Sequence, residues 1–318
     1  MKQEVDTKQN KTESTPTFTR YDLTDIPIEY FRLPNGRRLA YARYGEPGGV
    51  PVLYFHGCPG SRLEGRPTHE PAQSLGFDIF AVERPGCGFS EFASGYTTLD
   101  WVEDVAALAD GFGFERFGIM GFSGGGVYVN ACTFKMPERL LFAFDIGGWG
   151  PVGDEPALTA HLMPLDRFFL RRVASFGFMF RLPFSLIGLA ARYMSDKGFA
   201  KALQSSMGAD DRALIIGNDN MAHYFRALVK ESFRQGNRGP ADDAISCYSP
   251  WGFALSDIDY PTHIWHGTDD RFANYALAEY KHAQNPRSTL VTLEGYGHLR
   301  MATIFEDILT SARSMLDP

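Results

Sequence analysis

The sequence has few cysteines and no excess of basic residues, and both shortages restrict its function. Its four cysteines are widely spaced and form no Cys-x-x-Cys pair: Cys58, Cys87, Cys132 and Cys247. This spacing argues against a zinc site and a dense disulfide framework, and it favours a cytoplasmic protein in a reducing compartment. The 31 Lys and Arg residues are outnumbered by 38 Asp and Glu residues, which gives a net charge of -7. Because this balance offers no basic surface, we expect no nucleic-acid partner.

Long hydrophobic runs are also missing. Residues 1–22 are mostly polar and contain no apolar segment, which predicts a disordered tail and no secretory signal. The most apolar later stretch, residues 168–194, is interrupted by four arginines and a proline. Since charged residues are costly in a bilayer, we expect no stable membrane insertion.

Apolar residues are present in a regular order. Hydrophobic residues make up 44% of the 318 positions, enough for one large domain with an insertion. Short apolar runs alternate with amphipathic stretches, which predicts an α/β fold: a mostly parallel sheet of about eight strands flanked by helices. We expect an antiparallel hairpin at residues 29–33 and 38–44, strands at 50–55, 77–82, 117–122, 140–146, 261–265 and 289–293, and helices at 99–112 and 124–135.

Residues 150–248 interrupt this alternation. The stretch is largely helical in pattern and dense in Phe, Leu, Met and Arg. We interpret it as a helical cap, or lid, inserted into a core domain that residues 23–149 and 249–318 form.

One short motif carries the main chemical signal. Gly121-Phe122-Ser123-Gly124-Gly125 ends the predicted strand 117–122 and begins the helix 124–135. A chain that turns so sharply from strand to helix holds its serine in a strained conformation, and the flanking glycines remove side chains that would clash. Ser123 is therefore the candidate nucleophile. The N–H of Gly124, at the start of the helix, is a candidate donor to an oxyanion.

A second loop supplies the other donor. His56-Gly57-Cys58-Pro59-Gly60 follows the predicted strand 50–55. A sharp turn there directs the backbone N–H of Cys58 toward that of Gly124, and we predict an oxyanion hole formed by these two groups. The thiol of Cys58 has no adjacent base and is interpreted as incidental.

The general base and its acidic partner come from the C-terminal part of the chain. His298, in Tyr296-Gly297-His298, follows the last predicted strand and fits the order serine, acid, histidine. His266-Gly267-Thr268-Asp269-Asp270 offers two carboxylates, of which we choose Asp270 to orient the imidazole. Asp269 would then cap the following helix. Asp145, near the end of strand 140–146, is the alternative acid.

Together these motifs resemble those of the α/β-hydrolase fold superfamily, from about Ile28 to Met315. The matching segments are the oxyanion loop at 56–60, the Arg-Pro-Gly-x-Gly-x-Ser loop at 83–90, the elbow at 121–125, the acid loop at 266–270 and the base loop at 297–298. The resemblance implies an α/β-hydrolase fold of the serine esterase or lipase-like branch, with carboxylic ester hydrolysis as the commonest activity. A serine at the elbow disfavours the haloalkane dehalogenase and epoxide hydrolase branches, which use aspartate. Arg84, in the second loop, is interpreted as a structural residue that ties neighbouring loops together.

Proline iminopeptidases are the second branch that the sequence resembles. Their oxyanion loop reads His-Gly-Gly-Pro-Gly and their elbow has tryptophan after the serine, whereas this chain has Cys58 and Gly124 at those places. Such enzymes also need carboxylates in the cap to bind a free amino terminus. This cap contains five that are suitable, Asp154, Glu155, Asp210, Asp211 and Glu231. The iminopeptidase interpretation stays open, as does lactone or amide hydrolysis.

The sequence thus predicts a serine hydrolase that forms an acyl-enzyme intermediate and needs no metal ion or cofactor. Its partner would be a small to medium apolar ester, held by side chains of the elbow and the cap: Phe122, Phe168, Phe176, Met179 and Phe180. Two alternatives stay open. An exposed apolar face of the cap would suit a homodimer, and a small-molecule receptor on this fold can retain all three site residues.

Overall fold

The structure is a computed structural model that describes residues 21, 23, 25–173 and 177–316. The predicted tail, residues 1–22, lies outside this part of the chain except for Tyr21. The Tyr21 ring packs edge-on against Tyr224, with 5.6 Å between the ring centroids.

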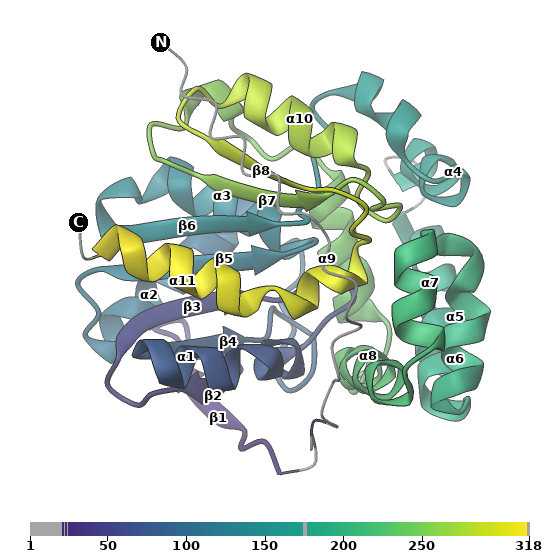
Figure 1. Cartoon of the computed structure of the whole chain (residues 1–318), viewed down its shortest axis with the longest axis horizontal. Coiled ribbons are helices and arrows are strands. Elements are labelled where there is room, and N and C mark those ends of the chain that lie inside the picture. Colours follow the sequence, from purple (N-terminus) through teal and green to yellow (C-terminus); the bar gives the residue numbers. More distant parts are fainter. Residues whose placement is uncertain (1–20, 22, 24, 174–176, 317–318) are drawn as a thin grey trace.

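An eight-stranded sheet forms the centre of the protein (Figure 1), with the order β1-β2-β4-β3-β5-β6-β7-β8. Strand β2 is antiparallel to β1 and β4, and the other neighbouring strands are parallel. The strands are β1 (Glu29–Arg32), β2 (Arg38–Gly45), β3 (Val50–Phe55), β4 (Phe77–Val82), β5 (Phe117–Phe122), β6 (Leu140–Ile146), β7 (His263–Gly267) and β8 (Thr289–Leu293). The predicted α/β fold with a mostly parallel sheet is confirmed.

Burial on both faces explains the continuous apolar runs of the central strands. Every residue of β4 and β5 is buried. In β3, Val52 and Tyr54 pack into one hydrophobic cluster and Leu53 and Phe55 into another, because successive side chains of a strand point to opposite faces. Strand β7 begins two residues later than predicted, at His263. Pro261 has no N–H to donate to a neighbouring strand, which favours the later start.

Helices cover both faces of the sheet (Figure 1). Helices α1 (His69–Leu75) and α11 (Phe305–Leu316) pack on the face that carries Val52 and Tyr54. The opposite face is covered by α2 (Thr98–Phe112), α3 (Gly125–Lys135) and α10 (Tyr275–Gln284). The sheet therefore has two separate hydrophobic layers, and its carboxyl edge is left for the loops.

Six further α-helices lie between β6 and β7 in the described chain, and we call them the cap. They are α4 (Pro164–Val173), α5 (Gly177–Tyr193), α6 (Asp196–Leu203), α7 (Ala209–Ile216), α8 (Asp219–Ser232) and α9 (Arg238–Tyr248). Figure 1 shows α5 to α8 on the right, beyond the ends to which the arrows of β5, β6 and β7 point. Within the described residues, no helix combines the length and apolar character that crossing a membrane requires.

A buried ion pair ties α10 to the end of β6. The Lys281 ammonium donates to Asp145 Oδ2 at 2.5 Å and to the Gly148 carbonyl at 2.9 Å. Asn130 donates to the same carboxylate oxygen at 2.9 Å. Burial lowers the pKa of Lys281, against the opposing effect of Asp145. Asp145 is thus engaged in a structural pair on the sheet.

We predict that Lys281→Met destabilises the protein by about 3–5 kcal/mol, because it leaves the buried carboxylate of Asp145 without its partner. Urea denaturation followed by circular dichroism measures this loss. The exposed Lys135 at the end of α3 provides a matched control, and Lys135→Met should change stability by less than about 0.5 kcal/mol. The double variant Asp145→Asn/Lys281→Met should recover part of the loss, and equal losses in the single and double variants would contradict the prediction.

Candidate active site

The turn between β5 and α3 holds Ser123 in a strained conformation. Its φ is 54°, the single positive value for a non-glycine residue in the described chain. The flanking glycines make the turn possible: a side chain at Gly121 would collide with the Gly125 carbonyl, and one at Gly125 with the Phe55 carbonyl. The Ser123 N–H donates to Ile146 O at 2.9 Å, which fixes the turn to β6. The serine is thereby presented at the carboxyl edge of the sheet.

The loops that carry the N–H groups of Cys58 and Gly124 meet beside Ser123. A Cβ built on Gly124 would lie 3.4 Å from Cys58 N, so the two loops are in contact. Among the hydrogen bonds of the described residues, none uses the N–H of Cys58 or of Gly124. Two neighbouring unused donors, one at a helix start, are suited to hold an oxyanion.

Arg84 binds the backbone of the loop that carries Cys58. Its guanidinium donates to His56 O at 2.6 Å and to Gly57 O at 2.9 Å, which fixes the orientation of these carbonyls. The same guanidinium forms two hydrogen bonds, of 2.6 and 2.7 Å, with Asp243 of the cap helix α9. Arg84 therefore has the structural role that the sequence predicted.

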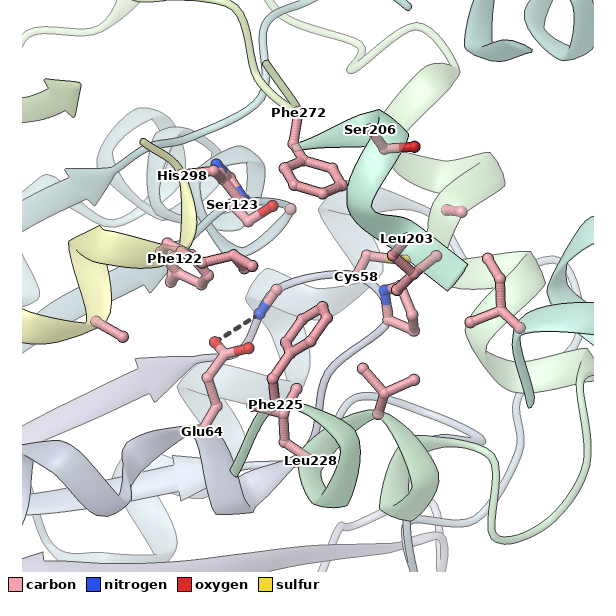
Figure 2. A pocket seen from close by; sticks show the side chains of 18 of the residues that line it. Cys58, Glu64, Phe122, Ser123, Leu203, Ser206, Phe225, Leu228, Phe272 and His298 are labelled. Atoms are coloured by element: carbon pink, nitrogen blue, oxygen red, sulfur yellow. Dashed lines mark hydrogen bonds between the residues drawn. The ribbon is translucent and has the colours of Figure 1, made fainter. Parts of the chain in front are cut away.

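Glu64 is a site residue that sequence reasoning missed. Its Oε1 accepts the Gly57 N–H at 2.8 Å and the Tyr54 hydroxyl at 3.0 Å. The side chain lines the cavity described below (Figure 2). Burial raises the pKa of Glu64 to about 7, although these hydrogen bonds lower it. No motif marks a glutamate seven positions after a glycine, so only the folded structure shows this contact.

The histidine and the aspartate chosen from the sequence are brought together. His298 Nδ1 lies 2.7 Å from Asp270 Oδ2, and Asp270 Oδ1 accepts the Ala273 N–H at 2.8 Å. Burial alone would lower the pKa of His298, but Asp270 outweighs it and raises that pKa above 6.5, with help from Asp211 and Glu64. Burial alone would raise the pKa of Asp270, but His298 and His266 lower it to about 2. An imidazole paired with a fixed carboxylate can accept a proton and hold the resulting charge.

Ser123 and His298 line the same cavity, and Figure 2 draws the imidazole beside the serine side chain. The ring of the adjacent Phe122 lies 4.8 Å from the His298 ring, measured between centroids. No hydrogen bond joins the Ser123 hydroxyl to His298 within the described structure, and such bonds are often long until a substrate binds. The arrangement can supply a nucleophile, a base and an oxyanion hole.

The cavity has a volume of about 420 Å³ and extends from Ser123 into the cap. Most of its lining is apolar, and the carboxylates among the lining residues are Glu64 and Asp166. Figure 2 shows Leu203, Phe225 and Leu228 around the cavity, and Phe272 next to His298. Within the described residues, no group of three or more His, Cys, Asp or Glu side chains is placed to hold a metal ion.

The predicted substrate-binding residues have different positions. Phe122 lines the cavity. Phe168 does not: its side chain is 46% exposed on α4. Phe176 lies outside the described residues, as do the side chains of Met179 and Phe180. The cap contributes instead Phe184 and Ile187 of α5 and several residues of α6 and α8, because which face of an apolar helix points inward depends on its packing.

Asp211 of the cap helix α7 holds the base loop and was also missed in this role. Its Oδ2 accepts the His298 N–H at 3.0 Å, and its Oδ1 accepts those of Leu299 and Arg300 at 2.8 and 3.2 Å. The carboxylate is fully buried. Burial raises the pKa of Asp211 to about 7, while His298 lowers it. Gly297 is required here, since a side chain at that position would collide with the Asp211 carboxylate.

Neighbouring aspartates complete this connection between cap and core. Asp210 Oδ2 accepts the Gly297 N–H at 3.0 Å and a hydrogen bond from Arg300 at 2.5 Å. Asp269 was expected to cap the helix that follows it, but its Oδ2 accepts the N–H of Asp210 at 3.0 Å, at the start of α7. Asp269 thus caps a helix of the cap, which comes much earlier in the chain.

Comparisons with known proteins bear on the family and the fold. The model of the family described as "Alpha/beta hydrolase family" matches residues 52–306. The chain is similar to a non-heme chloroperoxidase of Streptomyces lividans, with 26% identity over 277 residues that cover 85% of this chain and 92% of the relative.

Two further likenesses are useful. A proline iminopeptidase of Neisseria gonorrhoeae is 29% identical over 116 residues, which cover 35% of this chain and 36% of the relative. The solved structure of an esterase from Exiguobacterium antarcticum superposes with a TM-score of 0.66 at 16% identity, covering 91% of this chain and 99% of the other. At that identity the superposition supports the fold alone.

We predict that Asp211→Asn lowers the pKa of the His298 imidazole, because it removes a buried negative charge that favours the protonated ring. Histidine NMR titration measures the shift. Asp219→Asn is the matched control: that carboxylate is 70% exposed on α8, where it pairs with Lys197. The control should leave the pKa of His298 unchanged. An unchanged pKa in a folded Asp211→Asn protein would contradict the prediction.

Proposed function

The chain belongs to the alpha/beta hydrolase family, and on this premise we propose that it is a serine hydrolase that cleaves carboxylic esters of small to medium apolar substrates. The observation that carries the proposal is the position of Ser123, strained at the elbow and next to two unused backbone donors. His298 lines the same apolar cavity, and the buried Asp270 lies behind its imidazole, 2.7 Å from Nδ1.

In the proposed mechanism the Ser123 hydroxyl attacks the ester carbonyl carbon while His298 accepts its proton. The carbonyl oxygen becomes an oxyanion that the N–H groups of Cys58 and Gly124 stabilise, and each such donor contributes about 2.7–4 kcal/mol. His298 then protonates the alcohol as the C–O bond breaks. Water, deprotonated by His298, attacks the acyl-serine. His298 returns the proton to the Ser123 oxygen as the acyl C–O bond breaks and the acid leaves. Asp270 keeps the imidazole in the required tautomer throughout.

The apolar lining supports an apolar acyl or alcohol group. Hydrophobic pockets discriminate between substrates by about 1–3 kcal/mol per methylene, so a broad range of chain lengths is expected. A cavity of about 420 Å³ accommodates an ester of small to medium size.

A second candidate function is that of an aminopeptidase acting on N-terminal proline, favoured by the 29% identity to the N. gonorrhoeae iminopeptidase. The five cap carboxylates chosen from the sequence weigh against it, whereas a sixth, Asp166 of α4, does line the cavity and accepts the Tyr248 hydroxyl at 3.1 Å. Asp210 and Asp211 bind the base loop, Glu231 pairs with Arg62, and Asp154 accepts the Trp251 N–H. None of these side chains, nor Glu155, is among the residues that line the cavity in the described structure.

We expect the purified protein to release p-nitrophenol from acetyl, butyryl and octanoyl esters, and Ser123→Ala to reduce kcat by at least about 10³-fold. The variant lacks the hydroxyl that attacks the ester but keeps the substrate-binding cavity, so kcat falls. Cys87→Ala, at a buried thiol away from the cavity, is the control and should keep its turnover. A proline arylamide assayed in parallel separates the candidates: turnover of the amide alone favours the aminopeptidase. Binding of an apolar ester without turnover points to a receptor.

The pH dependence follows from His298. Its raised pKa means that the ring stays protonated, and cannot act as a base, up to a pH above 6.5. The acidic limb of kcat/KM should therefore lie above pH 6.5. Asp270→Asn removes the main cause of the raised pKa and should move the limb to lower pH, with a fall in kcat of about 10⁴-fold. A limb that stays in place in this variant would exclude His298 as the titrating base.

A further inference from the structure

The cap helix α5 exposes a regular row of large apolar side chains. Leu182, Leu186, Leu189 and Tyr193 are 66%, 61%, 53% and 74% exposed. Their spacing of four, three and four residues places them along one side of the helix. We call these four residues the α5 stripe. An exposed apolar row of this kind indicates a surface that binds an apolar partner, such as a membrane or another protein.

The α5 stripe reaches the mouth of the cavity. Leu186 is exposed to solvent and is also one of the residues that line the cavity. Its neighbours Pro183, Phe184 and Ile187, on the inner side of the same helix, belong to the lining as well. One helix therefore connects the apolar outer surface with the apolar cavity that contains Ser123.

The net charge of α5 and α6 differs from that of the remaining chain. Residues 177–203, which include α5 and α6, contain four Arg and Lys residues and one Asp, a net charge of +3. The other residues must then carry a net charge of -10, since the whole chain carries -7. Arg192 and Lys201 are exposed and take part in no ion pair within the described part of the chain. Arg181 is half-exposed and pairs with Asp242.

We propose that the α5 stripe docks the protein onto an anionic lipid surface, from which apolar substrates pass to the cavity. The combination of exposed leucines and a tyrosine with flanking cations suits the headgroup and acyl boundary of such a surface. A second copy of the chain fits less well. Pairing two α5 helices about a two-fold axis would bring the cations of both copies to one interface. The docking is peripheral, and it goes beyond the proposed hydrolysis.

Vesicle flotation tests the docking directly and does not depend on hydrolysis. The full chain is mixed with vesicles of phosphatidylcholine alone, or with about one third phosphatidylglycerol, and the bound fraction is measured. Binding should be at least about fivefold stronger to the anionic vesicles and should weaken in about 0.5 M NaCl. Equal binding to both kinds of vesicle would overturn the electrostatic part of the proposal.

The deciding variant is Leu182→Glu/Leu189→Glu, which changes the α5 stripe at two residues that do not line the cavity. It should weaken binding to anionic vesicles by about tenfold or more. Tyr30→Glu is the matched control, because Tyr30 is 47% exposed on β1, in the core domain. Arg192→Gln/Lys201→Gln should weaken binding to anionic vesicles while leaving weak binding to neutral ones unchanged.

Each outcome has one meaning. Retained binding in the Leu182→Glu/Leu189→Glu variant overturns the proposal, and so does failure of the native protein to bind anionic vesicles. If the native protein is a dimer by light scattering and this variant is a monomer, the stripe is a subunit interface instead. Thermal unfolding establishes that the variant is folded. Hydrolysis of a soluble p-nitrophenyl ester should be unchanged, which separates failure of docking from failure of the proposed function.

Discussion

The close approach of helix α3 to strand β3 determines the geometry of the whole site. No side chain fits at Gly125, because the Phe55 carbonyl occupies that space, so the helix begins almost on top of the sheet. The chain must leave β5 and enter α3 within three residues, and Ser123 takes up the strain with a φ of 54°. Such a conformation costs about 1–3 kcal/mol, which burial of the surrounding strands offsets. The same approach brings the N–H of Gly124 next to that of Cys58.

Buried carboxylates of the cap connect it to the loops that carry the chemistry. Asp243 reaches the oxyanion loop through Arg84, and Asp211 binds the backbone of the base loop directly. Both carboxylates are buried, and burial alone would raise the pKa of each. At Asp243 the Arg84 guanidinium outweighs burial and lowers the pKa, whereas at Asp211 burial prevails and raises the pKa to about 7. A guanidinium offsets the cost of burying a charged carboxylate, whereas backbone N–H donors offset that cost only in part. The position of His298 therefore depends on the cap as well as on the sheet.

Some site residues follow directly from the order of strands in the sequence, and others depend on contacts between distant segments. Ser123, Asp270 and His298 each follow a strand that an apolar run marks, and the carboxyl ends of parallel strands share one edge. Their convergence could therefore be inferred. Glu64 and Asp211 reach the site through tertiary contacts, with Gly57 and with the base loop, that no local sequence pattern predicts. Phe168 was expected in the pocket because it belongs to an apolar stretch of the cap, but the packing of α4 leaves its side chain 46% exposed.

The cap itself divides into two parts with different constraints. Helices α7 and α9 are fixed by Asp211 and Asp243 to the loops around Ser123, so a change there alters the positions of reacting groups. Helix α5 packs through Phe184 on Ala241 and Ala244 of α9, with the half-exposed pair of Arg181 and Asp242 beside it. Apolar contacts are less directional than buried ion pairs. Substitutions on the inner face of α5 should therefore alter which substrate is accepted and leave the geometry of His298 and Asp270 unchanged.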